Sequence, residues 1–209
     1  MSLFRPERDA FRASSLEVAP RLLGAVLRHE MPEGTVALRI TEVEAYIGDG
    51  LDPGSHAFRG RTPRNAVMYG GPGHLYAYFT YGMHVCANIV CSPEGEASAV
   101  LLRGAEVVEG AELAERRRIG ASGRRIPHRD LARGPARLVV AAGISLADDG
   151  ADLFAPPFEL LLPSVRPDYA TGPRTGVSGA GGGDAFPWRY WLPGEPTVSR
   201  YKRHPKSHD

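Results

Sequence analysis

Two runs of alternating side chains, joined by a short turn, constrain the fold most strongly. Residues 75–80 read Leu-Tyr-Ala-Tyr-Phe-Thr, and residues 85–90 read Val-Cys-Ala-Asn-Ile-Val. In both runs one set of apolar or small side chains recurs at every second position, as it does on one face of a β-strand. The intervening Tyr-Gly-Met-His contains the glycine that a tight turn favours. The pattern predicts a β-hairpin over residues 75–91.

Further strands and short helices are predicted on both sides of this hairpin. Apolar runs with strand-like spacing predict strands over residues 35–47, 97–103 and 158–162. Helical spacing, with capping residues or an opening proline, predicts helices over residues 15–28, 106–119 and 135–142. Residues 48–73 form a long loop rich in Gly, Pro and Arg, and such loops are usually functional. Strands outweigh helices without regular alternation, which favours an α+β or mainly β core.

The composition fits a single globular domain over residues 1–209. Apolar residues make up 43% of the chain, enough for a sizeable core. The ends, about residues 1–12 and 200–209, are expected to be flexible. No apolar run approaches the roughly 18 residues of a membrane span, and the charged start lacks the apolar centre of a secretory signal. We therefore expect a cytoplasmic monomer without membrane contact.

Charged and metal-ligating residues narrow the chemistry. The net charge is only +1, so a nucleic-acid surface would have to be basic by distribution rather than in total. The two cysteines lack metal-ligand spacing and the seven histidines are scattered, so neither a metal nor a cofactor is expected. Lysine occurs only at Lys202 and Lys206, which makes Schiff-base chemistry through a side-chain amine improbable.

Two carboxylates on the predicted strand 35–47 are the first candidates for catalysis. Glu42 and Glu44 fall on the same strand face, about 6.5–7 Å apart by strand rise. If both were buried, one could act as a base while the other had a structural role. Tyr46 lies on the same face and could bound a dry pocket in which a base acts more strongly. An exposed strand face with two solvated acids is the competing interpretation.

Other candidate residues lie in the loop, the hairpin and the next strand. Each has an ordinary structural alternative, such as core packing for a tyrosine or solvent exposure for an arginine. His56 and Tyr78 could complete an aromatic pocket, and the Asn88 amide could read the edge of a base. A buried Arg103 would need an acidic partner. Four residues are candidates for contact with nucleic acid. They are a large aromatic residue at the predicted hairpin tip, Tyr81, and three arginines of the loop, Arg59, Arg61 and Arg64.

Taken together, the longer strings resemble the alkyladenine (3-methyladenine) DNA glycosylase family. The resemblance is ordered along the chain and rests on strings that are long and unusual. They are Glu-Val-Glu-Ala-Tyr at 42–46, His-Ala-Phe-Arg-Gly-Arg-Thr-Pro-Arg-Asn at 56–65, Pro-Gly-His-Leu-Tyr-Ala-Tyr-Phe-Thr-Tyr-Gly-Met-His at 72–84, Leu-Leu-Arg at 101–103 and Gly-Pro-Ala-Arg-Leu at 134–138. Residues 139–186 match much less specifically.

The resemblance implies an α+β fold: a single domain with a curved antiparallel β core, flanking helices and a protruding β-hairpin. It implies a monofunctional DNA glycosylase that flips alkylated or deaminated purines out of duplex DNA and hydrolyses the N-glycosidic bond. Each residue that matches the family's motifs carries an expected role. These roles are catalysis for Glu44 and Arg103, a base pocket of Tyr46, His56, Tyr78 and Asn88, and intercalation or DNA contact for Tyr81, Met83, Arg64 and Arg137.

Three other classes of function remain open. A lesion-binding protein could flip bases without chemistry, although it would need no catalytic carboxylate. A metal-dependent nuclease would need a cluster of acids, for which Glu42 and Glu44 alone are few. An RNA-binding module could use the same aromatic side chains for stacking.

Overall fold

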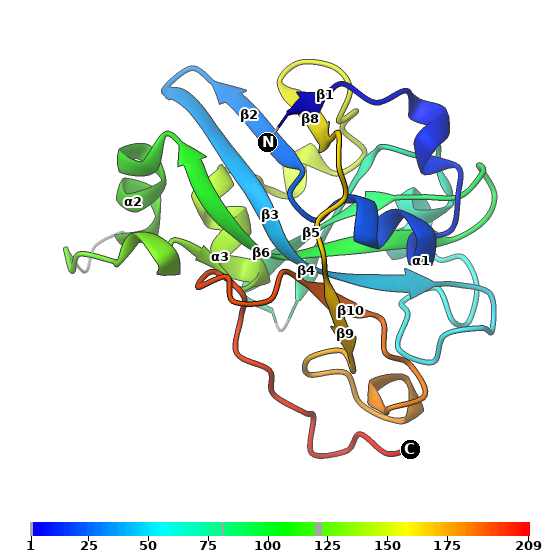
Figure 1. Ribbon diagram of the computed structural model, residues 1–209. Coiled ribbons are helices and arrows are strands. Elements are labelled where there is room, and N and C mark those ends of the chain that lie inside the picture. The colour runs from blue at the N-terminus through cyan, green and yellow to red at the C-terminus, as the bar shows by residue number, and fades with distance from the viewer. Residues whose placement is uncertain (1, 81, 120–122) are drawn as a thin grey trace.

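The protein is built on one antiparallel sheet (Figure 1). The computed structural model describes residues 2–80, 82–119 and 123–209. Within these ranges ten strands form one sheet, and all pairings between them are antiparallel. The main path runs β1 (Leu3–Phe4), β8 (Phe158–Pro163), β2 (Val26–Met31), β3 (Gly34–Ile47), β6 (Ser98–Glu109), β5 (His84–Val90) and β4 (Leu75–Thr80). Three short strands add to it, with β10 (Arg189–Trp191) between β3 and β9 (Ala170–Gly172), and β7 (Ala132–Arg133) beside β6.

Short helices flank this sheet and cover its core. They are α1 (Ser15–Val18), α2 (Ala111–Ile119) and α3 (Pro135–Ala142). The α3 helix packs against β5, β6 and β7, and α2 packs against α3. Leu38, Ile89 and Leu138 are almost completely buried between these layers. Burying one such side chain stabilises the fold by about 1.5–3 kcal/mol. The predicted α+β class with an antiparallel core is confirmed.

The helix predicted over residues 15–28 is wrong in its second half. Only Ser15–Val18 is α-helical, and a 3-10 turn follows at Ala19–Arg21. Gly24 then has φ of 81°, a left-handed conformation that ends a right-handed helix. Residues Val26–Met31 form β2, which pairs with β3 and β8. The sheet partners, which lie far away in sequence, override the local helical spacing.

The helix predicted over residues 106–119 begins too early. Residues 106–109 continue β6, which runs to Glu109 opposite Ala37 of β3. Gly110, with φ of 74°, separates this strand from α2, which starts at Ala111. The strand predicted over 97–103 is therefore longer than expected, because β3 offers a partner along its whole length.

A β-bulge in β3 changes which side chains of this strand face the apolar core. The register between β3 and β6 shifts on both sides of Glu42. Before the bulge Leu38 and Ile40 enter the core, whereas after it Val43 and Ala45 do. Two-residue spacing alone would put Leu38 and Ile40 on the same face as Glu42 and Glu44, and the bulge interrupts this alternation. An extra residue in one strand turns its side chains relative to the partner, and here it turns the two glutamates away from the apolar core.

The hairpin and the preceding loop agree with expectation in outline. β4 and β5 pair directly, with Thr80 opposite His84. Within the loop, Pro63–Tyr69 form a 3-10 helix with a capping box between Thr62 and Asn65. Asn65 also donates hydrogen bonds to two carbonyls of the loop. These bonds hold the loop that carries His56 in place.

Both ends of the chain make backbone contacts with the domain. β1 pairs with β8, and Gly179 bridges to Ser207. The flexibility expected for residues 1–12 and 200–209 stays a prediction. Within the described ranges, no helix combines the length and apolar character needed to cross a membrane.

Candidate active site

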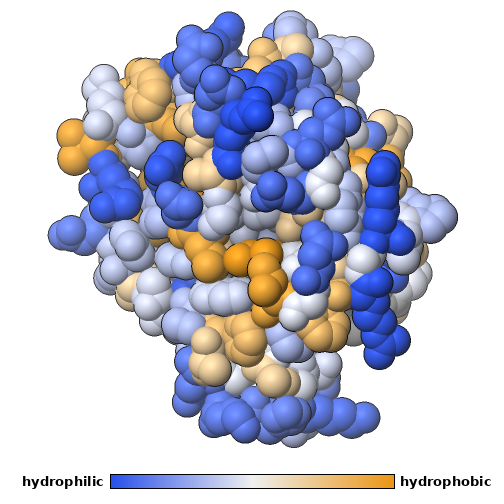
Figure 2. Space-filling model, turned by 90° about the vertical axis from the view of Figure 1, so that its right-hand side faces the viewer, coloured by the Kyte–Doolittle hydropathy of each residue, from blue (hydrophilic) through white to orange (hydrophobic). Residues whose placement is uncertain are grey.

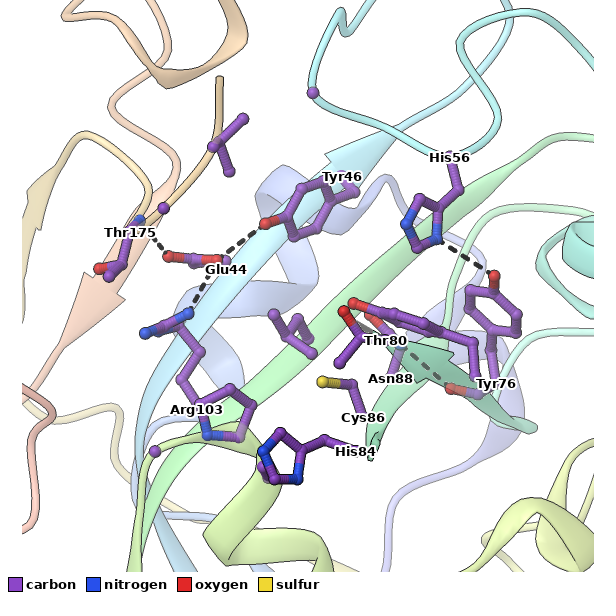
Figure 3. Close-up of a pocket in the computed structure, with 18 of the residues that line it drawn as sticks. Glu44, Tyr46, His56, Tyr76, Thr80, His84, Cys86, Asn88, Arg103 and Thr175 are labelled. Carbon is purple, nitrogen blue, oxygen red and sulfur yellow. Dashed lines mark hydrogen bonds and ion pairs between the residues drawn. The ribbon is translucent and has the colours of Figure 1, made fainter. Parts of the chain in front are cut away.

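A cavity of about 520 Å³ opens beside the glutamates of β3. Its volume lies within the usual range of small-molecule sites. Strands β3 to β6, the start of α3 and two loops surround it, and Figure 3 shows the side chains that point into it. Residues that line it and enter the argument below are Glu44, Tyr46, His56, Tyr76, Tyr78, Cys86, Asn88, Arg103, Arg137 and Thr175.

Glu44 lies in the cavity wall with three hydrogen-bond donors around it (Figure 3). The Thr175 backbone N–H donates to Oε1 at 2.6 Å. Tyr46 Oη donates to Oε2 at 2.8 Å, and Arg103 Nη1 lies 3.4 Å from the same oxygen. A carboxylate has about four acceptor positions. One position of Glu44 Oε1 is therefore left for a further donor, such as a water molecule.

Glu42 has a different environment and is an anchor between chain segments. Its Oε1 accepts from Arg189 Nε at 2.6 Å and Arg103 Nε at 3.1 Å. Its Oε2 accepts from the Ser199 backbone N–H at 2.6 Å. Burial alone would raise the pKa of Glu42, but the two arginines outweigh burial and lower it. Glu42 does not line the cavity, so a structural role follows for this carboxylate.

Arg103 joins the two glutamates. Its guanidinium contacts Glu42 through Nε and Glu44 through Nη1. Burial would lower the pKa of Arg103, but the two carboxylates raise it above its ordinary value, Glu44 most strongly. Arg103 therefore stays charged and compensates the buried negative charges. The acidic partner predicted for Arg103 is present.

Tyr46 forms one side of the cavity and is supported from behind. Burial and the Glu44 carboxylate raise the pKa of Tyr46 well above its ordinary value, so its hydroxyl remains a donor. The Arg174 guanidinium carbon lies 4.5 Å from the centroid of the Tyr46 ring. Arg174 is fully buried and forms a bidentate ion pair with Asp52, with two distances of 2.6 Å.

Aromatic side chains form the opposite wall. Tyr76 and Tyr78 stack with ring centroids 5.3 Å apart, and His56 meets Tyr78 edge-on at 4.5 Å. Tyr76 Oη lies 3.3 Å from His56 Nδ1. Burial raises the pKa of Tyr76 to about 12. His56 is an exposed residue as a whole, yet desolvation of its ring and the nearby Arg64 lower its pKa, which favours a neutral ring.

Asn88 and Cys86 line the cavity between these walls. Asn88 is almost fully buried, and its Nδ2 donates to the Tyr76 carbonyl at 3.1 Å, which fixes the orientation of the amide. Burial raises the pKa of Cys86, so its thiol stays protonated. The predicted pocket residues Tyr46, His56, Tyr78 and Asn88 thus lie around one cavity with Glu44 and Arg103.

Three described residues that are predicted to contact DNA lie at the cavity rim or beside the hairpin. Met83 is 69% exposed on the hairpin, and Arg137 is exposed at the cavity rim. Arg64 Nη2 donates to the Phe79 carbonyl at 2.9 Å, which places its charge beside the hairpin. Tyr81, the predicted intercalating residue, lies outside the described residues. The contact roles of these residues stay predictions.

Sequence reasoning missed the contribution of the segment around Arg174. Thr175 supplies the N–H that caps Glu44, and Arg174 Nη1 also donates to the Ala45 carbonyl at 3.0 Å. The segment reads Gly-Pro-Arg-Thr-Gly, a string with turn residues and a single cation but no periodic pattern. Its only signal is an arginine in an otherwise apolar and small-residue stretch.

Comparison with known proteins supports the resemblance found in the sequence. Residues 9–196 match the sequence model of the methylpurine-DNA glycosylase (MPG) family. A protein of Leifsonia xyli is 85% identical over 208 residues, covering 100% of this chain and 98% of its own. A Streptomyces avermitilis protein is 55% identical over 202 residues, covering 94% and 92%. Both are named "Putative 3-methyladenine DNA glycosylase". The chain belongs to the methylpurine-DNA glycosylase family.

Proposed function

We propose that this protein is a monofunctional DNA glycosylase that releases alkylated and deaminated purines from duplex DNA. One observation carries the proposal. A buried carboxylate, Glu44, borders an aromatic cavity large enough for a purine nucleotide and keeps one acceptor position for water. We further propose that the protein acts in the cytoplasm as a monomer, needs no cofactor and catalyses the first step of base excision repair.

Access to the target bond requires the nucleotide to leave the duplex. Unstacking costs a few kcal/mol and less at a damaged pair, which favours lesions over normal bases. The extruded purine would lie between Tyr46 and the stacked Tyr76 and Tyr78. A methylated purine carries positive charge, and an aromatic face attracts it by about 0.5–2 kcal/mol. Neutral lesions lack this attraction and depend more on shape.

The bond is then cleaved by water. The bond between C1′ and the base nitrogen breaks, its electron pair leaves with the base, and positive charge develops on the sugar. Ionised Glu44 stabilises this charge and accepts a proton from the water whose oxygen bonds to C1′. Arg103 holds the carboxylate in place. A cationic base leaves as a neutral molecule, whereas hypoxanthine has to gain a proton.

The lining of the cavity supports cleavage of the base alone. Strand cutting by a bifunctional glycosylase needs an amine that forms an imine with the sugar. Among the described residues that line the cavity there is no lysine. The expected product is an abasic site in an intact strand.

A metal-dependent nuclease is the second candidate, and the carboxylate environment argues against it. Guanidinium groups and backbone N–H groups occupy oxygens of Glu42 and Glu44. Across the described ranges no cluster of three or more His, Cys, Asp or Glu could hold a metal ion. Strand cleavage that disappears with EDTA would support this candidate.

The proposal predicts base release from duplexes that carry 3-methyladenine, 7-methylguanine, hypoxanthine or ethenoadenine. After incubation, hot alkali should cleave the strand at the lesion, because alkali breaks abasic sites. A sample without alkali should stay intact. Cleavage in that sample would contradict the monofunctional assignment, and release from none of the lesions would contradict the function itself.

Asn88→Ser is expected to relax discrimination against guanine. The hydrogen bond to the Tyr76 carbonyl fixes the Asn88 amide in the cavity wall. We infer that this amide would clash with the 2-amino group of a bound guanine, and that a smaller side chain would remove the clash. We expect the ratio of 7-methylguanine to hypoxanthine release to rise by roughly tenfold. Single-turnover rates on matched duplexes measure this ratio. An unchanged ratio would remove Asn88 from the selectivity mechanism.

A further inference from the structure

The last residues of the chain run beside the loop that borders the cavity. We call residues 200–208 the basic segment. Gly176, which lines the cavity, donates its backbone N–H to the Lys202 carbonyl at 3.0 Å. Gly179 donates to the Lys206 carbonyl at 2.9 Å. The segment begins after Ser199, whose N–H binds Glu42. Backbone contacts thus hold the basic segment against the cavity rim.

The segment places four basic side chains within seven residues. Arg200, Lys202, Arg203 and Lys206 are all exposed. Arg203 is paired with Asp184 and Asp209. The other three cations have no acidic partner among the described residues. Both lysines of the chain lie here, although its net charge is only +1.

The basic segment lies at one end of the molecule (Figure 1). In Figure 1 the C-terminal segment, red, forms the lower end below β9 and β10. Figure 2 is turned about the vertical axis, and its lower end is hydrophilic. Elsewhere exposed arginines are often neutralised, as in the pairs of Arg5 with Glu159 and Arg8 with Asp152. A local excess of positive charge follows for the basic segment.

The basic segment lies after the span of the family's sequence model, which covers residues 9–196. The 85% identical relative covers the segment as well, so it is not confined to this chain. Lys202 and Lys206 are four positions apart, so their Cα atoms lie at most about 14 Å from each other, and the turn at residues 205–206 shortens this distance. A distance of that order corresponds to about two or three neighbouring phosphates on one strand.

We propose that the basic segment binds the phosphate backbone of duplex DNA next to the nucleotide held in the cavity. The proposal rests on the proposed function for the position of the lesion. Arg200, Lys202 and Lys206 neutralise phosphates and release counterions, which adds affinity without reading the sequence. The backbone hydrogen bonds to Gly176 and Gly179 keep these charges at a fixed distance from Glu44.

The test replaces three side chains and leaves the backbone contacts intact. In Arg200→Gln/Lys202→Gln/Lys206→Gln the carbonyls that accept from Gly176 and Gly179 remain. Binding to a duplex with a central ethenoadenine is followed by fluorescence anisotropy at several salt concentrations. The slope of log affinity against log salt should become shallower by about 2–3, and affinity at about 0.1 M salt should fall at least about tenfold. In single-turnover assays of base release, the protein concentration that gives half of the maximal rate should rise, whereas the maximal rate should stay at the parental value.

Two controls make the result specific. Arg12→Gln/Arg21→Gln/Arg166→Gln removes the same charge from exposed positions that do not line the cavity, and it should keep the parental slope. Lys202→Arg/Lys206→Arg keeps the charge and should keep the affinity. The proposal would be overturned if the triple variant of the basic segment kept the parental slope and affinity. It would also be overturned if both triple variants lost the same affinity. If the parental protein released no base but its DNA binding still depended on the basic segment, only the proposed function would be refuted.

Discussion

Glu44→Gln is expected to slow the single-turnover release of hypoxanthine by at least about a hundredfold. Glutamine has the same shape but cannot accept a proton or carry the negative charge that stabilises the developing sugar cation. Its amide would also add a fourth donor to a place where Thr175, Tyr46 and Arg103 already donate. A duplex with one hypoxanthine, saturating protein and alkaline cleavage of the product give the rate.

Glu42→Gln is the matched control, because it makes the same change two residues away on the same strand. Glu42 joins Arg189 and Ser199 and does not line the cavity, so the main loss should be in stability. Thermal unfolding and release rates of both variants separate the two roles. If Glu44→Gln released hypoxanthine at the parental rate and Glu42→Gln released none, Glu42 and not Glu44 would be the general base.

Asp52→Asn is expected to cost about 3–5 kcal/mol of unfolding free energy, because it leaves a buried arginine without a counter-charge. Asp52 and Arg174 are both 0% exposed, and their bidentate contact connects segments 122 residues apart in sequence. Arg174 also lies on the Tyr46 ring, so base release should fall as well. Urea unfolding followed by circular dichroism measures the stability.

Asp152→Asn provides the comparison for this change. It removes one partner of an ion pair with Arg8 in which both side chains are more than a third exposed. Such a pair contributes about 0–1 kcal/mol. The double variant Asp52→Asn/Arg174→Met should recover part of the lost stability, because it removes the unpaired charge. Equal costs for Asp52→Asn and Asp152→Asn would contradict the structural importance given to the buried pair.

The sequence predicted those parts of the site that depend on local patterns. Alternation predicted the hairpin and placed Tyr78 and Asn88 on it, and both line the cavity. The strand with Glu44 and Tyr46 was also predicted, because two-residue spacing fixes which side chains share a face. For these residues short-range geometry determines the outcome.

Long-range pairing decided the parts that the sequence could not predict. The bulge at Glu42 depends on the register between β3 and β6, and neither strand specifies it alone. β2 forms because β3 and β8 accept it, against a helical pattern. The cap on Glu44 comes from Thr175, 131 residues away, in a segment without periodicity. Such contacts arise from the folded chain as a whole.

The capping of both glutamates by late segments has a consequence during synthesis. Glu42 and Glu44 leave the ribosome well before Thr175 and Ser199, which donate backbone N–H groups to them from 131 and 157 residues further along the chain. A nascent or prematurely terminated polypeptide would contain the complete hairpin and the acids without their caps. The capped arrangement of both acids would therefore form only after Ser199 has left the ribosome, and shorter polypeptides would lack it.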